Sequence, residues 1–270
     1  MKCECTGSAF VAGDVAALDF LWPGPAPRGG QFFLVKPRRT GVFLGRPLSA
    51  ASWKPRDASN PLSGGVVSFL VLRRGRGSRE LMDMRPGEEA EILGPLGNTW
   101  DEMEGRKVNE EKPTVEPSEK KPGGKAEGPF ALVSGGVGIA PLLLFASELE
   151  ARPFDFYAGF RTGSFGLDKI KPRSLTIATE DGSLGLKGRI PDFFTPSGYS
   201  AVFACGPEPM LKIVGDACIA SEVPCFISLE RHMACGVGAC LGCTVKTTGG
   251  NRLCCKDGPI FRVEEVCFDP

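Results

Sequence analysis

Five cysteines near the C-terminus have the type and spacing needed to hold a metal cluster. Cys235, Cys240 and Cys243 follow a C-x4-C-x2-C order, and a fourth ligand can come from the adjacent Cys254 or Cys255. This is the ligand order of plant-type 2Fe–2S clusters, and thiolates are the soft ligands that iron takes in them. Because neighbouring side chains of an extended segment point to opposite sides, only one of the last two cysteines can face the cluster.

The glycines between these cysteines indicate a tightly wound loop. Gly236, Gly238 and Gly242 permit left-handed backbone angles and a close approach of amides to the sulfurs. The main alternative is a structural zinc site with four cysteine ligands. Zinc sites usually pair two short C-x2-4-C hairpins, whereas here three cysteines lie together and the fourth is distant. The spacing therefore favours iron–sulfur over zinc.

The composition is that of an intracellular multidomain protein. The chain has 270 residues, of which 42% are hydrophobic, and its 32 Lys and Arg balance 32 Asp and Glu. It thus lacks the basic excess that a nucleic-acid partner requires. The apolar run 130–146 is shorter than the roughly 20 residues of a membrane span, so we expect no membrane segment. With eleven cysteines and no signal peptide, the chain is expected in the reducing cytoplasm.

The order of apolar and turn-forming stretches predicts a multi-domain α+β protein. Residues 1–98 contain short apolar runs divided by glycine and proline, which is typical of a small antiparallel β-barrel. Residues 99–128 are charged and poor in large apolar side chains, which predicts a flexible inserted linker. Residues 129–224 alternate strands and helices, as in an α/β domain with a parallel sheet. Residues 225–270, which carry the cysteine motif, are expected to form a small cluster domain.

Two stretches of the first segment carry groups suited to an anion. Arg46 offers a planar, permanently charged fork, and Ser49 offers a hydroxyl three positions later. Gly77 and Ser78 lie among arginines, so their amides can form an anion-binding nest. A surface arginine at a strand end and a basic hairpin turn are the plain alternatives.

A glycine loop in the α/β segment predicts phosphate binding. The apolar strand 130–134 runs into this loop, and an apolar helix follows over 142–149, so free amides and the helix dipole can face an anion. Cys205 and Gly206 end a later strand, where ligands of parallel sheets bind. Cys205 is expected beside a nicotinamide, with a buried small residue as the alternative. The loop glycines are Gly135, Gly136 and Gly138.

The cluster motif resembles that of one family. Residues 233–243, together with Cys255-Lys-Asp-Gly-Pro, are similar to the electron-transfer, iron–sulfur flavoprotein subunit of class B dihydroorotate dehydrogenase, within the ferredoxin-reductase-like superfamily. The likeness covers the chain outside 101–127. The other motifs that fall in the family's order are 46–49, 94–98, 135–141, 179–182 and 204–210.

The resemblance implies an FAD-binding β-barrel, an NAD-binding α/β domain and a C-terminal 2Fe–2S domain. It favours Cys255 as the fourth ligand beside Cys235, Cys240 and Cys243. It places Arg46 at the FAD pyrophosphate and Ser49 near the isoalloxazine. The residues implied to contact FAD or the nicotinamide nucleotide are Arg46, Pro47, Leu48, Ser49, Leu70, Val71, Leu72, Gly77, Ser78, Gly135, Gly136, Gly138, Cys205 and Gly206.

The resemblance also implies a role in pyrimidine biosynthesis. A partner subunit carrying FMN would oxidise dihydroorotate, and this chain would take electrons singly through its cluster, collect two on FAD and pass a hydride to NAD⁺. The two subunits would form a hetero-oligomer, a heterotetramer in the simplest case, and no side chain of this chain would act as acid or base. Two alternatives stay open: a reductase subunit of another NAD(P)H-linked complex (sulfide- or ferredoxin-linked), and a non-catalytic redox sensor or zinc-stabilised adaptor.

Overall fold

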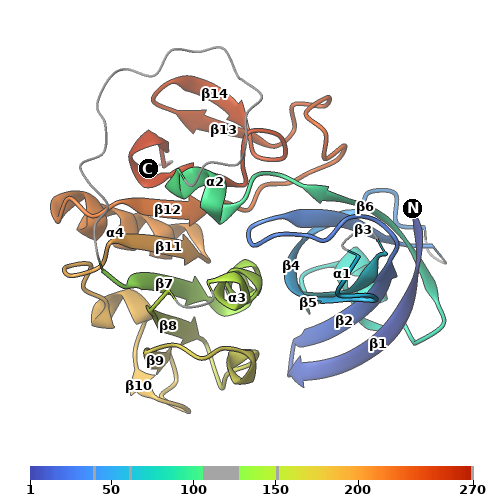
Figure 1. Cartoon of the computed structure of the whole chain (residues 1–270), viewed down its shortest axis with the longest axis horizontal. Coiled ribbons are helices and arrows are strands. Elements are labelled where there is room, and N and C mark those ends of the chain that lie inside the picture. Colours follow the sequence, from blue (N-terminus) through green and yellow to red (C-terminus); the bar gives the residue numbers. More distant parts are fainter. Residues whose placement is uncertain (39–40, 61–62, 106–127, 150–151, 269–270) are drawn as a thin grey trace.

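The structure is a computed structural model that describes residues 1–38, 41–60, 63–105, 128–149 and 152–268. A β-barrel and a sheet flanked by helices lie side by side in Figure 1, and a small hairpin lies beyond the sheet near the C-terminus. This arrangement confirms the predicted multi-domain α+β fold, with its antiparallel barrel and parallel sheet. Most of the predicted 99–128 linker falls outside the described residues.

Six antiparallel strands close the barrel in the order β1-β2-β5-β4-β3-β6. Apolar side chains alternate along the strands and meet inside, where Phe33 lies 5.4 Å from Phe69 and 5.1 Å from Trp22, both in edge-to-face contact. Closure leaves no unpaired strand edge. The elements of the barrel are β1 Lys2–Ala12, β2 Val15–Trp22, β3 Phe32–Pro37, β4 Arg46–Pro55, β5 Gly65–Leu72, α1 Arg76–Met82 and β6 Glu89–Leu96.

A seven-stranded sheet forms the second body, in the order β10-β9-β8-β7-β11-β12-β15. All its pairs are parallel except β12 with β15. Its central strands are buried along their length, as parallel strands covered on both faces must be. The strands are β7 Phe130–Gly135, β8 Phe154–Phe160, β9 Ser174–Thr179, β10 Leu186–Lys187, β11 Ala201–Cys205, β12 Cys225–Ser228 and β15 Ile260–Arg262.

Helices cover both faces of this sheet. Helix α3 lies between the sheet and the barrel and packs against β4, whereas α4 covers the other face (Figure 1). The helices are α3 Ile139–Glu148 and α4 Glu208–Ala220, with 3₁₀ turns η1 Gly136–Gly138, η2 Leu167–Lys169, η3 Ile190–Phe193 and η4 Val263–Glu265.

The C-terminal segment leaves the sheet and returns to it. After β12 the chain forms a loop and the two-stranded hairpin of β13 Thr244–Thr247 and β14 Gly250–Leu253. It then re-enters the sheet as β15, antiparallel to β12. Two strands of the predicted 225–270 segment therefore extend the sheet of the 129–224 segment, and the cysteine loop lies between them.

The short helix α2 (Trp100–Glu104) joins the two bodies. Thr99 caps it through a hydrogen bond from the Glu102 amide, and the wholly buried Trp100 donates to the carbonyl of Pro141 at 3.4 Å. The predicted linker thus begins with an ordered turn, because its one large aromatic side chain packs under α3. Beside it, the amide of Gly29 donates to both carboxylate oxygens of Glu148, at 2.9 and 3.0 Å.

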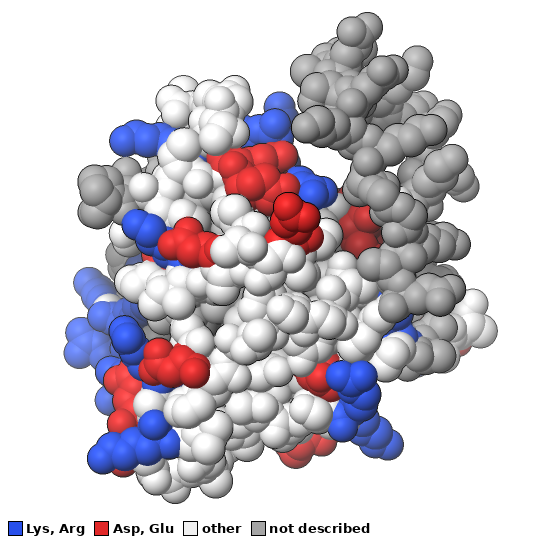
Figure 2. Space-filling view, turned by 90° about the vertical axis from the view of Figure 1, so that its left-hand side faces the viewer, with Lys and Arg blue, Asp and Glu red and all other residues white. Residues whose placement is uncertain are grey.

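The surface carries charges of both signs. Figure 2 shows Lys and Arg interspersed with Asp and Glu around the face that it displays, with an uncharged area near the centre. Within the described ranges, no helix combines the length and the apolar character needed to cross a membrane.

Candidate cofactor and nucleotide sites

Backbone amides of the cysteine loop point at three of the four predicted ligand sulfurs. The Gly238 amide donates to Cys255 Sγ at 3.2 Å. The Cys240 amide donates to Cys235 Sγ, and the Cys255 amide to Cys243 Sγ, both at 3.4 Å. Amides in such positions stabilise negative charge on sulfur. The loop is therefore wound so that its backbone faces the thiols.

The loop reaches this shape through left-handed residues. Gly236 and Gly238 have φ of 72° and 82°, as predicted. Gly242 is not among the positive-φ residues, and Leu241 takes the left-handed conformation instead, with φ of 59°. A Cβ at Gly236 would lie 2.7 Å from the side chain of Leu34 on β3, so the loop rests directly on the barrel.

The adjacent Cys254 and Cys255 face opposite ways. Cys254 is fully buried, and its thiol donates to the carbonyl of Leu229 at 3.2 Å. Burial raises the pKa of this thiol to about 12. The sulfur of Cys255 instead accepts the Gly238 amide within the loop. The two residues lie in a turn that follows β14, so the turn, and not strand alternation, sends their sulfurs apart.

The donor set of the loop fits a 2Fe–2S cluster. The amides of Val237 and Cys240 lower the pKa of the Cys235 thiol to about 6, while burial and the neighbouring Cys243 thiol raise that of Cys255 to about 11. Within the described ranges, no three Cys, His, Asp or Glu side chains converge as ligands of a single ion. A 2Fe–2S cluster spreads its four cysteines over two irons, so it does not require such convergence.

Arg46 and the start of α1 meet on the barrel surface. The Arg46 guanidinium packs on Gly77 so closely that a Cβ there would overlap it, and it also donates to the carbonyl of Leu44 at 2.7 Å. A guanidinium beside the first turn of a helix is suited to a phosphate. The 73–79 stretch is thus the entry to a helix, and the hairpin-turn alternative is wrong.

Ser78 has a structural task at this helix entry. Its hydroxyl accepts the amides of Arg74 and Gly75, at 2.9 and 3.0 Å, and its side chain is buried. These bonds fix the turn before α1. The Ser78 hydroxyl is therefore occupied by bonds within this turn.

The predicted flavin-side residues lie on the paired strands β4 and β5. On β4, Pro47 is exposed, and Leu48 and Ser49 are half-buried. On β5, Val71 belongs to the barrel core and Leu70 to the packing around α3. Only Leu72, at the end of β5, lines the large pocket described next.

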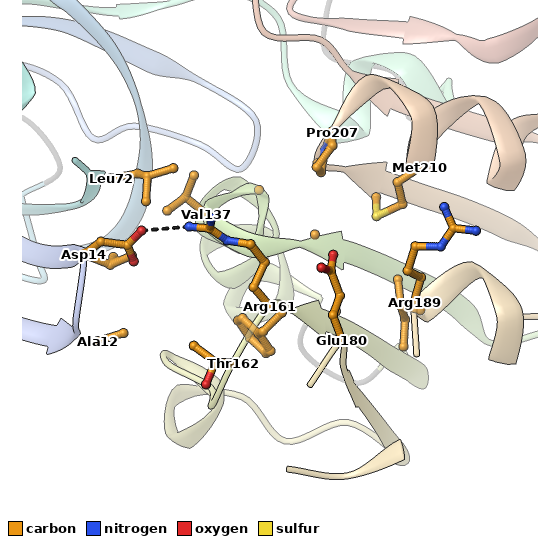
Figure 3. Close-up of a pocket in the computed structure, with 18 of the residues that line it drawn as sticks. Ala12, Asp14, Leu72, Val137, Arg161, Thr162, Glu180, Arg189, Pro207 and Met210 are labelled. Carbon is orange, nitrogen blue, oxygen red and sulfur yellow. Dashed lines mark hydrogen bonds and ion pairs between the residues drawn. The ribbon is translucent and has the colours of Figure 1, made fainter. Parts of the chain in front are cut away.

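A cavity of about 990 Å³ opens between the barrel and the carboxyl ends of the sheet strands (Figure 3). The barrel contributes the β1–β2 hairpin tip and the end of β5. The sheet contributes the glycine loop 135–138, the ends of β8 and β9, and the start of α4. Strand order reverses between β7 and β11, and α/β sheets bind ligands at such a switch point.

The glycine loop and the end of β11 pack tightly against each other. A Cβ at Gly138 would overlap the carbonyl oxygen of Cys205, so only glycine allows this approach. Gly135, Gly136, Gly138 and Gly206 all line the pocket. The side chain of Cys205 is buried, and burial raises its pKa far above the ordinary value. Gly206, rather than the Cys205 thiol, is the pocket-lining residue.

The sequence motifs do not indicate the Asp14 side chain at the pocket. Asp14 of the β1–β2 hairpin pairs with Arg161 at 2.8 Å, and Arg74 lies 3.8 Å from Glu230. Both pairs join the barrel to the other body across the pocket. Asp14 sits in an ordinary hairpin turn, so its sequence carries no signal for this contact.

Known relatives match both the cluster segment and the whole chain. The model of the "iron-sulfur cluster binding domain of dihydroorotate dehydrogenase B" matches residues 230–267. A Clostridium acetobutylicum protein named "Dihydroorotate dehydrogenase B (NAD(+)), electron transfer subunit" is 39% identical over 244 residues, covering 90% of this chain and 87% of that protein. A Caldanaerobacter subterraneus protein of the same name is 33% identical, covering 99% of this chain and 98% of that protein.

Solved structures agree on the architecture. A structure described as giving insights into flavin-based electron bifurcation, of an NADH-dependent reduced ferredoxin-NADP oxidoreductase, matches with a TM-score of 0.78 and 28% identity, over 98% of this chain and 89% of that chain. The ferredoxin reductase in carbazole 1,9a-dioxygenase matches with a TM-score of 0.60 and 20% identity, over 83% of this chain and 66% of that chain. The second likeness concerns the fold alone.

Proposed function

The chain belongs to the family of dihydroorotate dehydrogenase B (NAD(+)) electron transfer subunits, and on this premise we propose that it carries electrons from an FMN-containing catalytic partner to NAD⁺ in pyrimidine biosynthesis. The resemblance read from its motifs is confirmed. A 2Fe–2S cluster moves one electron, a nicotinamide moves a hydride and a flavin does both, so the flavin belongs between the other two. The protein's part is to hold and orient these groups.

Cys235, Cys240, Cys243 and Cys255 are the proposed cluster ligands. Three of their sulfurs already accept backbone amides, which is the observation that carries most weight. The inward turn of Cys254 further supports Cys255 as the fourth ligand. Cys240 is exposed and Cys243 buried, so the loop would present one side of the cluster toward solvent or a partner.

The barrel is the proposed FAD site. Arg46, packed on Gly77 at the start of α1, would pair with the FAD pyrophosphate. Pro47, Leu48 and Ser49 continue along the same strand and would contact the isoalloxazine. Since Arg46 already donates to Leu44, its fork is held in place before the ligand arrives, which lowers the cost of binding.

The 990 Å³ pocket is the proposed NAD⁺ site. Amides of Gly135, Gly136 and Gly138, with the helix α3 that follows, would hold the nucleotide's pyrophosphate. This leaves the nicotinamide end directed toward Gly206 and Leu72, where the barrel approaches the sheet. The chain's residues thus position the two reacting rings and need no acid or base among them.

The partner and the compartment are part of the same proposal. We expect this chain and the catalytic subunit to assemble into a heterotetramer, which a mass measurement of the complex would test. All eleven cysteines lie within the described residues, and none of them forms a disulfide. Thiols persist in a reducing compartment, which supports the cytoplasm.

The decisive experiment is an absorption spectrum of the anaerobically purified chain with iron, zinc and flavin analysis. We expect about two irons per chain, bound FAD, and bleaching of both chromophores by NADH. The chain alone should reduce a dye with NADH, and orotate should form only after the FMN-containing partner is added. Orotate formation by the chain alone, or a colourless protein holding one zinc, would contradict the proposal.

A second candidate is a reductase subunit of a different NAD(P)H-linked complex. The 28% identity to the ferredoxin-NADP oxidoreductase chain favours it, because the likeness spans nearly the whole of this chain. Co-purification separates the two. A partner that binds orotate supports the dihydroorotate role, whereas a partner that reduces ferredoxin and ignores orotate supports the second candidate.

A further inference from the structure

Arg161 occupies a position that usually reads the ribose of a dinucleotide. It follows directly after β8, the second strand of the nucleotide sheet, and lines the pocket. In dinucleotide-binding folds an acidic residue there bonds the ribose 2′-hydroxyl of NAD, while an arginine nearby accommodates the 2′-phosphate of NADP. The residue type at this position thus suits NADP, whereas the relatives are named for NAD(+).

The acidic group that is absent from the end of β8 is supplied by the barrel. Asp14, at the tip of the β1–β2 hairpin, accepts a hydrogen bond from Arg161 Nη2 at 2.8 Å. Figure 3 shows the arginine extended toward Asp14, with Glu180 on the other side of it. The hairpin tip is anchored without this side chain, because the Arg73 amide donates to the Asp14 carbonyl at 2.9 Å. The Asp14 side chain is therefore not needed to hold the hairpin tip in place, and its carboxylate is directed at Arg161 in the pocket.

We propose that Asp14 sets the preference of this pocket for NAD⁺ over NADP⁺, by holding Arg161 and by repelling a 2′-phosphate. The 2′-phosphate of NADP⁺ would have to displace the Asp14 carboxylate from Arg161 and would then lie beside that carboxylate. The Glu180 carboxylate also lines the pocket. The unphosphorylated ribose suffers neither penalty. The specificity of the α/β domain is thus determined partly by the barrel, and this inference rests on the proposed nucleotide site.

The pair is exposed, which limits the size of the effect. The side chains of Arg161 and Asp14 are 73% and 45% exposed, so solvent and salt screen their charges. Replacing the carboxylate by an amide should therefore shift the affinity for a 2′-phosphate by about five- to tenfold at low salt. The shift should shrink as salt is added.

The test uses the holoprotein and two ligands that cannot accept a hydride, ADP-ribose and 2′-phospho-ADP-ribose. Calorimetric titration should show that Asp14→Asn tightens 2′-phospho-ADP-ribose by about five- to tenfold and changes ADP-ribose by less than about twofold. Adding Arg161→Ala should remove most of that gain, because only the screened repulsion between Asp14 and the phosphate is then left to relieve. A matched control is Glu264→Gln, which breaks another Asp/Glu–Arg pair, with Arg262 at 2.7 Å, away from the pocket.

The outcomes separate this inference from the proposed function. Unchanged affinities in Asp14→Asn, or a gain that survives Arg161→Ala in full, would overturn the role of Asp14 while leaving the nucleotide site intact. Failure of the wild-type holoprotein to bind ADP-ribose would overturn both. Bleaching of the flavin by NADPH relative to NADH is a second readout, and Asp14→Asn should raise that ratio.

Discussion

The cysteine loop and the buried core beneath it use the same side chain in opposite ways. In the loop, backbone amides lower the pKa of Cys235 to about 6, which favours the thiolate that iron binds. In the core, burial raises the pKa of Cys254 to about 12 and keeps it a thiol that donates to Leu229. Whether a cysteine of this segment favours thiolate or thiol therefore depends on where its sulfur points and not on its position in the sequence.

At Glu148 a donated amide and burial act on the pKa of the same carboxyl group, in opposite directions. Its carboxylate accepts the Gly29 amide, as the loop sulfurs accept theirs. Burial between α3 and the barrel nevertheless raises its pKa to about 7. A donated amide thus lowers the pKa of the Cys235 thiol, but it loses to burial at Glu148, at the seam between the two bodies, and also at Cys255.

The largest expected effect comes from replacing Cys254 and Cys255 by serine, one at a time. Cys255→Ser should reduce iron from about two per chain to well below one, because it removes a ligand. Cys254→Ser should keep its iron, since a serine hydroxyl can still donate to the Leu229 carbonyl. Iron analysis and the visible spectrum measure both. Iron loss in Cys254→Ser with retention in Cys255→Ser would reverse the assignment.

A pH series on Glu148→Gln sharpens the comparison at the seam. Because the folded pKa of Glu148 is raised from 4.5 to about 7, its contribution to stability is full below pH 4.5 and is lost as pH rises through 7. Between pH 5.5 and 8 the wild type should therefore lose about 2 kcal/mol relative to the glutamine variant.

The thermal midpoints of both proteins across that range measure the difference, with Glu264→Gln as a control acid on the surface. Glutamine keeps an oxygen for the Gly29 amide, so the hydrogen bond survives while the titration is removed. A constant difference in midpoint from pH 5.5 to 8 would mean that burial does not govern this carboxyl.

The smallest test concerns the backbone of the loop. Gly238→Ala places a Cβ at φ of 82° and 3.0 Å from the Lys256 side chain, which should cost about 1–2 kcal/mol and misdirect the amide that bonds Cys255. Faster release of iron to a chelator is the expected result. Gly249→Ala, in the nearby β13–β14 turn without a left-handed angle, should release iron at the wild-type rate.

Local spacing made the cluster motif, the glycine loop and most strands predictable. The ligand order of Cys235 to Cys243 and the strand before Gly135 are encoded within a few residues, so the sequence alone indicates their chemistry. The hydroxyl bonds of Ser78, the inward-facing Cys254 and the burial of Cys205 depend on which elements pack together. The contact of Asp14 with Arg161 could not be predicted for the same reason, because the two residues meet only when the barrel lies against the sheet.

Strand β15 completes the edge of the sheet with residues near the end of the sequence. The barrel is complete at residue 96, so it can form while the ribosome is still adding the rest. Strand β12 gains its outer neighbour only with residues 260–262, after the cysteine loop has been synthesised. Until then β12 is an open edge, the kind that joins other chains in aggregation.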